Sequence, residues 1–422
     1  MKLLAFAIAL VPFPLLAQGP LEPPAGPPAA SMKTLQELSD QIAQLGTQLS
    51  TAQSDLVKTR AALGRVQADQ QLLTGLLSTS AASLSLPWNI GIVESANSVG
   101  TFHSMTLSPE GQPAVAYYKL TGTDLKYAIY DGSSWHIETA SGFGGVDTSI
   151  AFGPNGEPAI SSWNVILGAT SAVQYSTRDA GVWTTVEVDV GNNIGRNTSL
   201  AFGPDGQPAI AYYDQPNGNL KFARYNGVTW TIVTVDNSAA DVGGVDNSLV
   251  FGPDGQPAIA YYDATNQDLK FARYNGSTWT LTTVDSTGSV GVDPSLKFGP
   301  DGQPAIAYLD LGNLDLKIAR YNGTTWTPAT VESAGAVGRS ASLAFGPDGQ
   351  PAISHHDQGT QDLRFTRYNG SSWTGGTVDT PGNVGSFCAL SFGFDGQPVI
   401  SYYDQTNEDL KFARKGVFKP AP

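Results

Sequence analysis

The spacing of apolar residues changes near residue 85. Before that point apolar residues recur alternately three and four positions apart, and after it short alternating runs are separated by turn residues. The first pattern is typical of an α-helix with a narrow apolar stripe, and the second is typical of half-buried β-strands. The sequence therefore predicts a helix over residues 32–78 and an all-β domain over residues 87–414.

The predicted helix keeps its apolar stripe for about six heptads, interrupted at Thr59 and Gln70. A lone helix with so narrow a stripe has no core of its own in which to bury it. We therefore predict an α-helical coiled-coil stalk that makes the protein a homo-oligomer through residues 35–77. The alternative is a helix that packs on the neighbouring domain, and the number of helices in the stalk stays open. The stripe consists of Leu35, Leu38, Ile42, Leu45, Leu49, Ala52, Leu56, Leu63, Val66, Leu73 and Leu77.

The all-β domain consists of one unit of about 47 residues that occurs seven times. Each copy divides at Pro-Asp-Gly and Asn-Gly signals into four short segments rich in Val, Ile, Tyr, Phe and Thr, which predicts a four-stranded antiparallel sheet. Seven such copies favour the blades of a seven-bladed β-propeller. A linear array of separate small domains is the rival, but each unit alone would have a poor core. The copies begin at Ser104, Ser149, Ser199, Ser248, Ser295, Ser342 and Ala389.

The two ends of the repeat region predict that the ring is closed. The seventh copy stops after "DLKFARKG" and lacks a fourth strand, whereas residues 87–103 resemble the fourth strand and following loop of the other copies. We therefore expect the strand at Trp88 to pair beside Leu410–Arg414. Strand four would then be outermost and strand one would line a central channel. The longer loops, from strand two to three and from strand four to the next blade, share one face, which we call the loop face. The tight turns share the other, the turn face.

One tryptophan stands at the start of each fourth strand, and we predict that these side chains pack between blades. The residues are Trp88, Trp135, Trp183, Trp230, Trp279, Trp326 and Trp373. Lys221 and Arg224 of strand three are predicted to pair with acidic residues of an adjacent blade, and Cys388 is predicted to be buried.

The turn between strands three and four resembles a known motif. "RYNGSTW" is similar to the Asp-box of sialidase-like propellers: Gly276, Thr278 and Trp279 match it, while Tyr274 stands where the motif has Asp and Ala272 where it has Ser. The ring thus resembles secreted bacterial seven-bladed β-propeller repeat proteins with degenerate Asp-box turns. Asp-boxes in that family are structural, so the resemblance implies a fold and no activity. The Arg-Ile-Pro of sialidases is not found.

The segments outside these two regions suggest export. Lys2, the apolar run Leu3–Leu16 and Ala17 have the layout of a signal peptide over residues 1–17. A Pro-rich linker follows at 18–31, and residues 415–422 form a C-terminal tail. We expect a secreted, periplasmic or cell-surface protein with no membrane span in the mature chain. A net charge of −14 argues against nucleic acid as a partner.

A ring of polar residues on the loop face is the candidate ligand-binding site. Each Asp ends a second strand, each Asn follows three residues later, and the tyrosines lie nearby as possible stacking surfaces for a sugar. The alternative is that each Asp caps its own loop as an Asx-turn. The residues are Asp214, Asp263, Asp310, Asp357, Asp404, Asn217, Asn266, Asn313, Asn407, Tyr213, Tyr262 and Tyr403.

Blade two departs from the repeat between its second and third strands, where three additional residues occur in "WNVILGATSA". We expect its apolar residues to be exposed on the loop face and to contact a partner. The alternative is a flap over the channel mouth. The residues are Trp163, Val165, Ile166 and Leu167.

The sequence assigns no catalytic residue, metal ligand or cofactor. His355 and His356 are adjacent in a strand and should point to opposite faces, so they are poorly placed to hold one ion together. We therefore predict an exported, oligomeric, non-catalytic protein that binds a glycan or a protein partner through its loop face. The alternatives are a glycoside- or polysaccharide-acting enzyme of the sialidase-like type and a structural component of a cell-surface layer or appendage.

Overall fold

The computed structural model describes residues 37, 39–48, 86–95, 98–166, 170–238 and 241–416. The chain divides into two compact units, residues 1–60 and 61–422. In the first unit residues 39–48 are helical, and the side chains of Ile42 and Leu45 are 70% and 62% exposed. No helix among the described residues has the length and apolar character that a membrane crossing requires.

Several predicted segments lie outside the described residues. These are the signal peptide at 1–17, the linker at 18–31, most of the coiled-coil segment at 32–78 and the end of the tail at 417–422.

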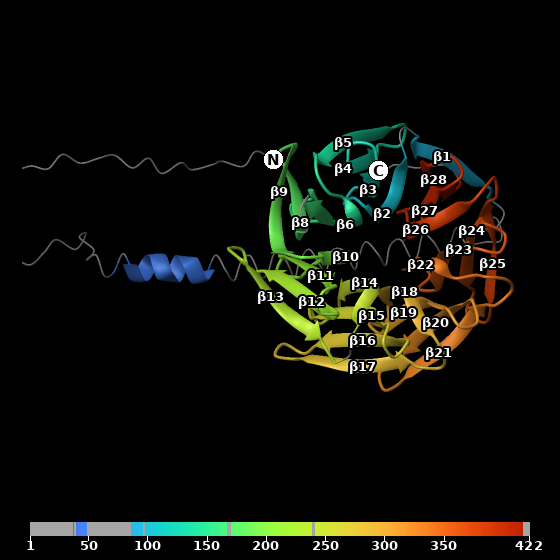
Figure 1. Cartoon of the computed structure of the whole chain (residues 1–422). Coiled ribbons are helices and arrows are strands. Elements are labelled where there is room, and N and C mark those ends of the chain that lie inside the picture. Colours follow the sequence, from blue (N-terminus) through green and yellow to red (C-terminus); the bar gives the residue numbers. More distant parts are fainter. Residues whose placement is uncertain are drawn as a thin grey trace, which may run out of the picture. The chain divides into compact units, whose positions relative to one another are not determined.

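The second unit contains seven sheets, each of four antiparallel strands (Figure 1). Blade 1 contains β2 (Val99–Leu107), β3 (Pro113–Lys119), β4 (Asp124–Tyr130) and β5 (Trp135–Ser141). Blade 2 contains β6 (Val146–Phe152), β7 (Pro158–Ile166), β8 (Thr170–Asp179) and β9 (Val182–Gly191). Blade 3 contains β10 (Ile194–Phe202), β11 (Pro208–Asp214), β12 (Asn219–Tyr225) and β13 (Trp230–Asp236). Blade 4 contains β14 (Val242–Phe251), β15 (Pro257–Asp263), β16 (Asp268–Tyr274) and β17 (Trp279–Asp285).

The remaining blades repeat this arrangement. Blade 5 contains β18 (Val290–Phe298), β19 (Pro304–Asp310), β20 (Asp315–Tyr321) and β21 (Trp326–Glu332). Blade 6 contains β22 (Arg339–Phe345), β23 (Pro351–Asp357), β24 (Asp362–Tyr368) and β25 (Trp373–Asp379). Blade 7 contains β26 (Val384–Phe392), β27 (Pro398–Asp404), β28 (Asp409–Lys415) and, from the other end of the domain, β1 (Trp88–Glu94).

The ring closes as predicted, because β1 pairs antiparallel with β28. The register runs from Trp88 opposite Lys415 to Glu94 opposite Leu410. The first strand of each blade lies nearest the centre, and β2 contacts both β6 and β26 (Figure 1). The predicted seven-bladed propeller of four-stranded blades is therefore confirmed.

Large and small side chains alternate along the second strand of a blade, and both faces of this strand are buried. In β15 the large side chains Ile259 and Tyr261 pack toward blade 3, and the small side chains Ala258 and Ala260 pack toward blade 5. All four are 0% exposed. A large face of one blade therefore meets a small face of the next, which lets flat sheets pack closely around a centre.

The tryptophans pack between blades, as predicted. Trp279 of blade 4 lies against Phe222 of blade 3 with ring centroids 5.2 Å apart in an edge-to-face arrangement. The same contact joins Trp326 to Phe271 at 5.1 Å, and Trp88 to Phe365 at 5.4 Å. Cys388 is buried, as predicted.

A second repeated contact between blades is polar. The carboxylate of Asp236, at the end of blade 3, accepts hydrogen bonds from Tyr261 Oη at 2.6 Å and Lys270 Nζ at 2.7 Å, both in blade 4. Although burial alone would raise it, the pKa of Asp236 is lowered by hydrogen bonds from Lys270, Ser238 and Tyr261. Equivalent contacts are centred on Glu94, Asp189, Asp285, Glu332 and Asp379.

The predicted pairing of Lys221 with an adjacent blade is confirmed by its 3.2 Å contact with Asp189. Arg224 instead pairs with Asp205, which lies in the turn between the first two strands of its own blade. The prediction for Arg224 is therefore wrong, because this side chain points back toward the turn face of blade 3.

Replacing Lys270 by Met should leave the Asp236 carboxylate buried without its cation. We expect the free energy of unfolding at pH 7, measured in urea, to fall by about 3 kcal/mol. Because the pKa of Asp236 is lowered, its contribution is present above the ordinary carboxyl range and is lost as the pH falls below it. The variant should therefore lose less stability on acidification than the parent protein.

Lys126 provides a matched control, because it occupies the same strand position in blade 1 but contacts only its own blade, with Thr139 at 2.7 Å and Asp124 at 3.9 Å. Lys126→Met should cost about 0.5 kcal/mol or less. Equal losses for the two variants would contradict a special role for the polar contact between blades.

Candidate functional site

The predicted ring of aspartates lies at the ends of the second strands, but its carboxylates are enclosed. The five aspartates are between 1% and 3% exposed. Asp263 accepts hydrogen bonds from Asn266 N at 3.0 Å and from Asn266 Nδ2 at 2.9 Å. Asp310 with Asn313 and Asp404 with Asn407 repeat both contacts. Asn217 reaches the Asp214 carboxylate only through its side chain, and its backbone N donates to the Asp214 carbonyl instead. Asp357 instead accepts from Gly359 N and Thr360 N.

A cation also approaches each of these aspartates. Lys221 lies 3.2 Å from Asp214 and Lys411 lies 3.5 Å from Asp404. Since caps and cations already surround the carboxylates, this geometry matches the capping alternative. A ligand contact at these aspartates and asparagines stays a prediction.

The three predicted tyrosines are also buried, at 6–8% exposure. The Tyr213 hydroxyl donates to Asp241 at 2.8 Å, and the Tyr262 hydroxyl lies 3.3 Å from Ser289 Oγ. Tyr403 differs from the other two because it lines a cavity, described below. Only Tyr403 is therefore placed to meet a ligand in that cavity.

The expected exposure of Trp163 is wrong. Its side chain is 7% exposed, and the Arg196 guanidinium lies over its ring at 4.4 Å from the centroid. The additional residues lengthen the hairpin, since Val165 pairs with Ser171 and Ile166 pairs with Thr170. The side chains of Val165 and Ile166, and all of Leu167, lie outside the described residues, so a partner contact there stays a prediction.

The channel mouth on the loop face is formed by one residue from the first strand of each blade. All seven have positive φ, at 50–54° in six of them and 133° in Asp246. Because this conformation recurs in every blade, it belongs to the repeat and sets the direction of these side chains. The residues are Phe102, Asp147, Asn197, Asp246, Asp293, Ser340 and Phe387.

Close packing explains why the chain bulges at this position. In blade 5 a Cβ on Gly291 would lie only 2.6 Å from the Cα of Leu269, so the backbone approaches blade 4 as only glycine allows. The pairing of β18 with β19 then shifts between Val292 and Ser295. The bulge turns Asp293 out of the ladder and toward the channel mouth.

The side chains at the mouth divide it into two unlike parts. Phe102 and Phe387, from blades 1 and 7, are in contact with ring centroids 5.0 Å apart. In blades 4 and 5, the carboxyl groups of Asp246 and Asp293 are hydrogen-bonded to each other. Burial and the adjacent Asp293 charge raise the pKa of Asp246 well above the ordinary value, so the pair holds a proton more firmly than an isolated carboxylate.

A cavity of about 760 Å³ opens beside the mouth over blades 5 to 7 and 1. Phe387 and Tyr403 form an aromatic part of its lining, with ring centroids 6.4 Å apart. Arg339 is the cation of the lining, and its guanidinium lies 3.8 Å from Asp293. The amide side chains that line the cavity are Gln358, Gln361, Asn383 and Gln405.

His356 completes the lining at the position where Tyr262 stands in blade 4. It is 6% exposed, and its ring interacts with the side chain of Asn383, which also lines the cavity. Burial lowers the pKa of His356, which favours a neutral ring at neutral pH. A neutral imidazole can donate to or accept from a ligand hydroxyl.

Most of this site was missed from the sequence. The signal that would have found it is the variability of one column of the repeat, which is occupied by Phe, Asp, Asn, Asp, Asp, Ser and Phe. This column lies between a glycine that occurs in all seven copies and a serine that occurs in six. Because the second strands are nearly identical, the aspartates at their ends were predicted as the binding site instead. Residues that recur from blade to blade form the scaffold, whereas residues that differ between blades line the cavity.

Replacing Asp246 by Asn should remove the repulsion that opposes ionisation of the Asp246–Asp293 pair. Because the pKa of Asp246 is raised, its contribution to stability is full below the ordinary carboxyl pKa and is lost as the pH rises through the raised value. We expect the variant to melt about 3 °C higher than the parent at pH 8 and to show a flatter dependence of Tm on pH.

Asp254→Asn is the control of opposite sign. Hydrogen bonds from Gln256 N and Arg273 lower the pKa of Asp254 despite partial burial, so its contribution is present at neutral pH and lost in acid. This variant should melt at a lower temperature than the parent at pH 8. A lower Tm for Asp246→Asn would contradict the proton-sharing pair.

No family model and no curated protein matches this chain. The chain is similar to several solved structures. The chain is similar to YCF48 bound to D1 peptide, with 16% identity, 81% of this chain and 100% of that chain covered, and a TM-score of 0.49. It is similar to a protein of unknown function from Dyadobacter fermentans, with 14% identity, coverage of 77% and 97%, and a TM-score of 0.49. A third structure, Hadza microbial sialidase Hz136, shares 15% identity with coverage of 75% and 66% and a TM-score of 0.43.

Proposed function

We propose that this protein is a non-catalytic, lectin-like binding protein that takes an oligosaccharide at the channel mouth on the loop face. One observation carries the proposal: the cavity of about 760 Å³ that combines Phe387 and Tyr403 with four amide side chains, Arg339 and His356. The cavity has the size of a small-molecule site.

The chemistry of the lining suits a sugar. Amide groups offer both a donor and an acceptor, as a sugar hydroxyl does. His356 adds one more polar side chain to the lining. Aromatic rings pack against the C–H face of a pyranose, and Phe387 and Tyr403 provide such surface.

One pair of carboxyl groups at the mouth, Asp246 and Asp293, does not match a glycosidase. Enzymes that hydrolyse glycosides hold two carboxyl groups about 5–9.5 Å apart across the scissile bond. Asp246 and Asp293 are hydrogen-bonded to each other, so no sugar ring fits between them. Within the described ranges, no three His, Cys, Asp or Glu side chains gather closely enough to hold a metal ion.

We further propose that the protein is exported by residues 1–17 and is oligomeric through residues 35–77. The second point rests on the apolar stripe of the sequence, of which the described helix contains Ile42 and Leu45. In an oligomer several propeller domains are linked, so once one of them has bound a glycan, the others are held at a high effective concentration near further glycans without any new contact. Weak binding at each mouth would thus become strong binding to a surface with many glycans.

A glycan array tests the binding site. The parent protein should bind a defined set of oligosaccharides, and Gln358→Ala combined with Gln405→Ala should reduce the signal at least about tenfold, because both amides line the cavity. Gln215→Ala is the matched control: it occupies the same exposed first loop position in blade 3, away from the cavity, and should bind like the parent.

Two results would contradict the proposal. One is the absence of any glycan signal for the full-length protein, and the other is an equal loss in the Gln215→Ala control. Urea unfolding of each variant excludes a loss of fold.

The oligomer is tested by placing charge in the apolar stripe. Ile42→Lys combined with Leu45→Lys should convert the full-length protein to a monomer in sedimentation equilibrium, because Lys at two stripe positions cannot be buried between helices. Gln44→Lys, on another face of the same helix, should leave the mass unchanged. A parent protein that is already monomeric would contradict the proposed coiled-coil stalk.

A further inference from the structure

The junctions between blades contain a repeated site for an arginine side chain on the turn face. In blade 4, Arg273 of β16 donates from Nη1 to the Gln256 carbonyl at 2.6 Å and from Nη2 to Asp254 at 2.5 Å. Its guanidinium carbon lies 5.2 Å from the ring centroid of Phe298 in the next blade. We call this set of ring, carbonyl, turn side chain and turn glycine the arginine cradle.

In four consecutive junctions an arginine lies over the ring of the next blade and pairs with the aspartate of its own turn. The carbonyl contact is present at Arg224 and Arg273. The guanidinium-to-ring distances are 4.9 Å for Arg224 over Phe251, 5.2 Å for Arg273 over Phe298, 6.0 Å for Arg320 over Phe345 and 5.3 Å for Arg367 over Phe392. At three of these the first glycine of the turn makes room: a Cβ on Gly203, Gly252 or Gly346 would lie 2.3–2.5 Å from an arginine Nη2. These geometries define the ligand that the cradle fits.

The junction between blades 2 and 3 has the cradle without its arginine. Thr177 pairs with Ala159 as Arg224 pairs with Ala209, so Thr177 stands at the arginine position of blade 2. A Cβ on Gly153 would lie 3.4 Å from Cζ of Phe202, as one on Gly299 would lie 3.2 Å from Cζ of Phe345, where Arg320 lies farther from the ring than the other arginines. Blade 1 differs, because Ile129 occupies its arginine position and packs in the same cluster as Phe152.

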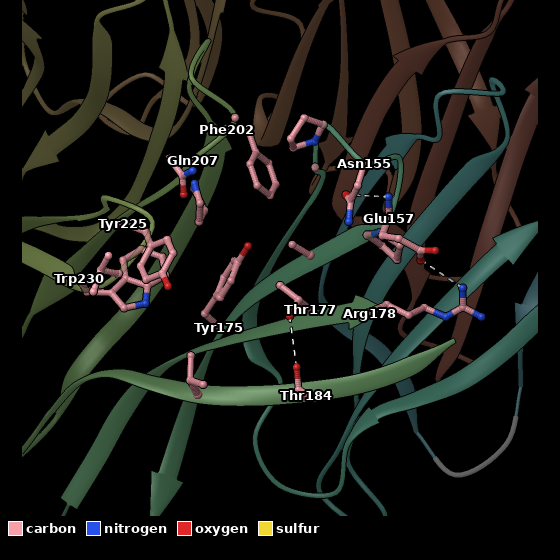
Figure 2. Close-up of a pocket in the computed structure, with 18 of the residues that line it drawn as sticks. Asn155, Glu157, Tyr175, Thr177, Arg178, Thr184, Phe202, Gln207, Tyr225 and Trp230 are labelled. Carbon is pink, nitrogen blue, oxygen red and sulfur yellow. Dashed lines mark hydrogen bonds and ion pairs between the residues drawn. The ribbon is translucent and has the colours of Figure 1, made fainter. Parts of the chain in front are cut away.

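The neighbouring Arg178 does not fill the vacancy. It donates to Glu138 at 2.8 and 3.0 Å and to Glu157 at 3.3 Å. Figure 2 shows its guanidinium directed toward Glu157 and away from Phe202. The result is an open groove of about 660 Å³ between the two blades.

The groove keeps the groups that hold an arginine in the other junctions. The Phe202 ring faces it, and Asn155 Oδ1 stands where Asp205 stands in blade 3, accepting from Glu157 N at 3.2 Å as Asp205 accepts from Gln207 N at 3.1 Å. Figure 2 shows the Tyr175 hydroxyl pointing toward Phe202, at a strand position that is Phe222 in blade 3. Tyr175 thus adds an acceptor that the filled cradles lack.

The charge of the groove is also suited to a cation. Glu157 and Glu187 line it together with one cation, Arg178, and the whole chain carries a net charge of −14. An aromatic ring with nearby carboxylates attracts a guanidinium by cation–π and ionic contacts together. The groove is larger than one side chain, so the backbone that carries the arginine also has room beside Tyr225 and Trp230.

We propose that this groove binds the guanidinium group of an arginine side chain presented by a partner protein. The external arginine takes the place that the chain's own arginines take in blades 3 to 6. The site lies on the turn face between blades 2 and 3, apart from the channel mouth, and does not depend on saccharide binding at the loop face.

The test uses the full-length protein with methyl labelling and N-acetyl-arginine methylamide as the probe. The probe should shift the NMR signals of the Val186 and Val228 methyl groups, which line the groove. The citrulline analogue has nearly the same shape without the charge and should bind at least about tenfold more weakly. Methyl glucoside tests whether the groove takes a sugar instead.

Two substitutions separate the proposal from nonspecific binding. Thr177→Arg should fill the groove with the chain's own arginine, abolish the shifts and leave the unfolding midpoint unchanged or higher. Arg224→Thr should open a second cradle at Phe251, and the probe should then also shift the methyl group of the introduced threonine. The second variant gains a site, so loss of fold cannot imitate its result.

Four outcomes would overturn the proposal. They are the absence of shifts with up to about 50 mM probe, unchanged shifts in Thr177→Arg, equal affinity for the arginine and citrulline probes, and shifts with methyl glucoside alone. The last result would make the groove a second sugar site.

Discussion

The pairing of β1 with β28 is the contact on which the rest of the structure depends. It joins residues from the two ends of the domain, with Trp88 opposite Lys415. Without it blade 7 would have three strands and the ring would present open sheet edges, which pair readily with other chains. Closure also brings Phe102 beside Phe387 and brings Tyr117 and Lys119 to Glu94. The channel mouth and its cavity therefore exist only in the closed ring.

Contacts that recur around the ring form the scaffold, and positions that occur once identify the sites. The tryptophan contacts and the contacts of Tyr and Lys with Asp recur because each blade must pack on the next in the same way. Where one column of the repeat varies, no packing requirement fixes the residue. The channel-mouth column and the arginine column both vary, and each of the two cavities lies beside residues of one of these columns. Ile129, by contrast, fills its junction.

The sequence predicts the scaffold well because its signals are local and repeated seven times. Blade number, strand order and ring closure follow from turn residues and from the position of Trp88. Both sites escape such reasoning because they depend on side-chain direction. Blade 2 shows why: Arg178 lies one residue beyond the arginine position, and a shift of one residue in a strand places a side chain on the opposite face. Only the pairing of Thr177 with Ala159 shows that the cradle is open. The exposure expected for Trp163 failed for a similar reason, since Arg196 covers it from the next blade.

The ring architecture also explains how one junction can lack a contact that its neighbours have. A blade packs only on the two blades beside it, so stability is spread over seven junctions and a local loss stays local. A cation–π contact at a partly exposed site contributes about 0.5–1 kcal/mol, which is small beside the buried faces that each junction retains. In the junction of blades 2 and 3, the Trp230 contact with Tyr175 at 5.2 Å and the bond from Tyr212 to Asp189 at 2.6 Å are both present. Because Thr177 stands there in place of an arginine, the junction has a groove while the blades stay packed. The strands of the ring form the rigid walls that a binding site needs.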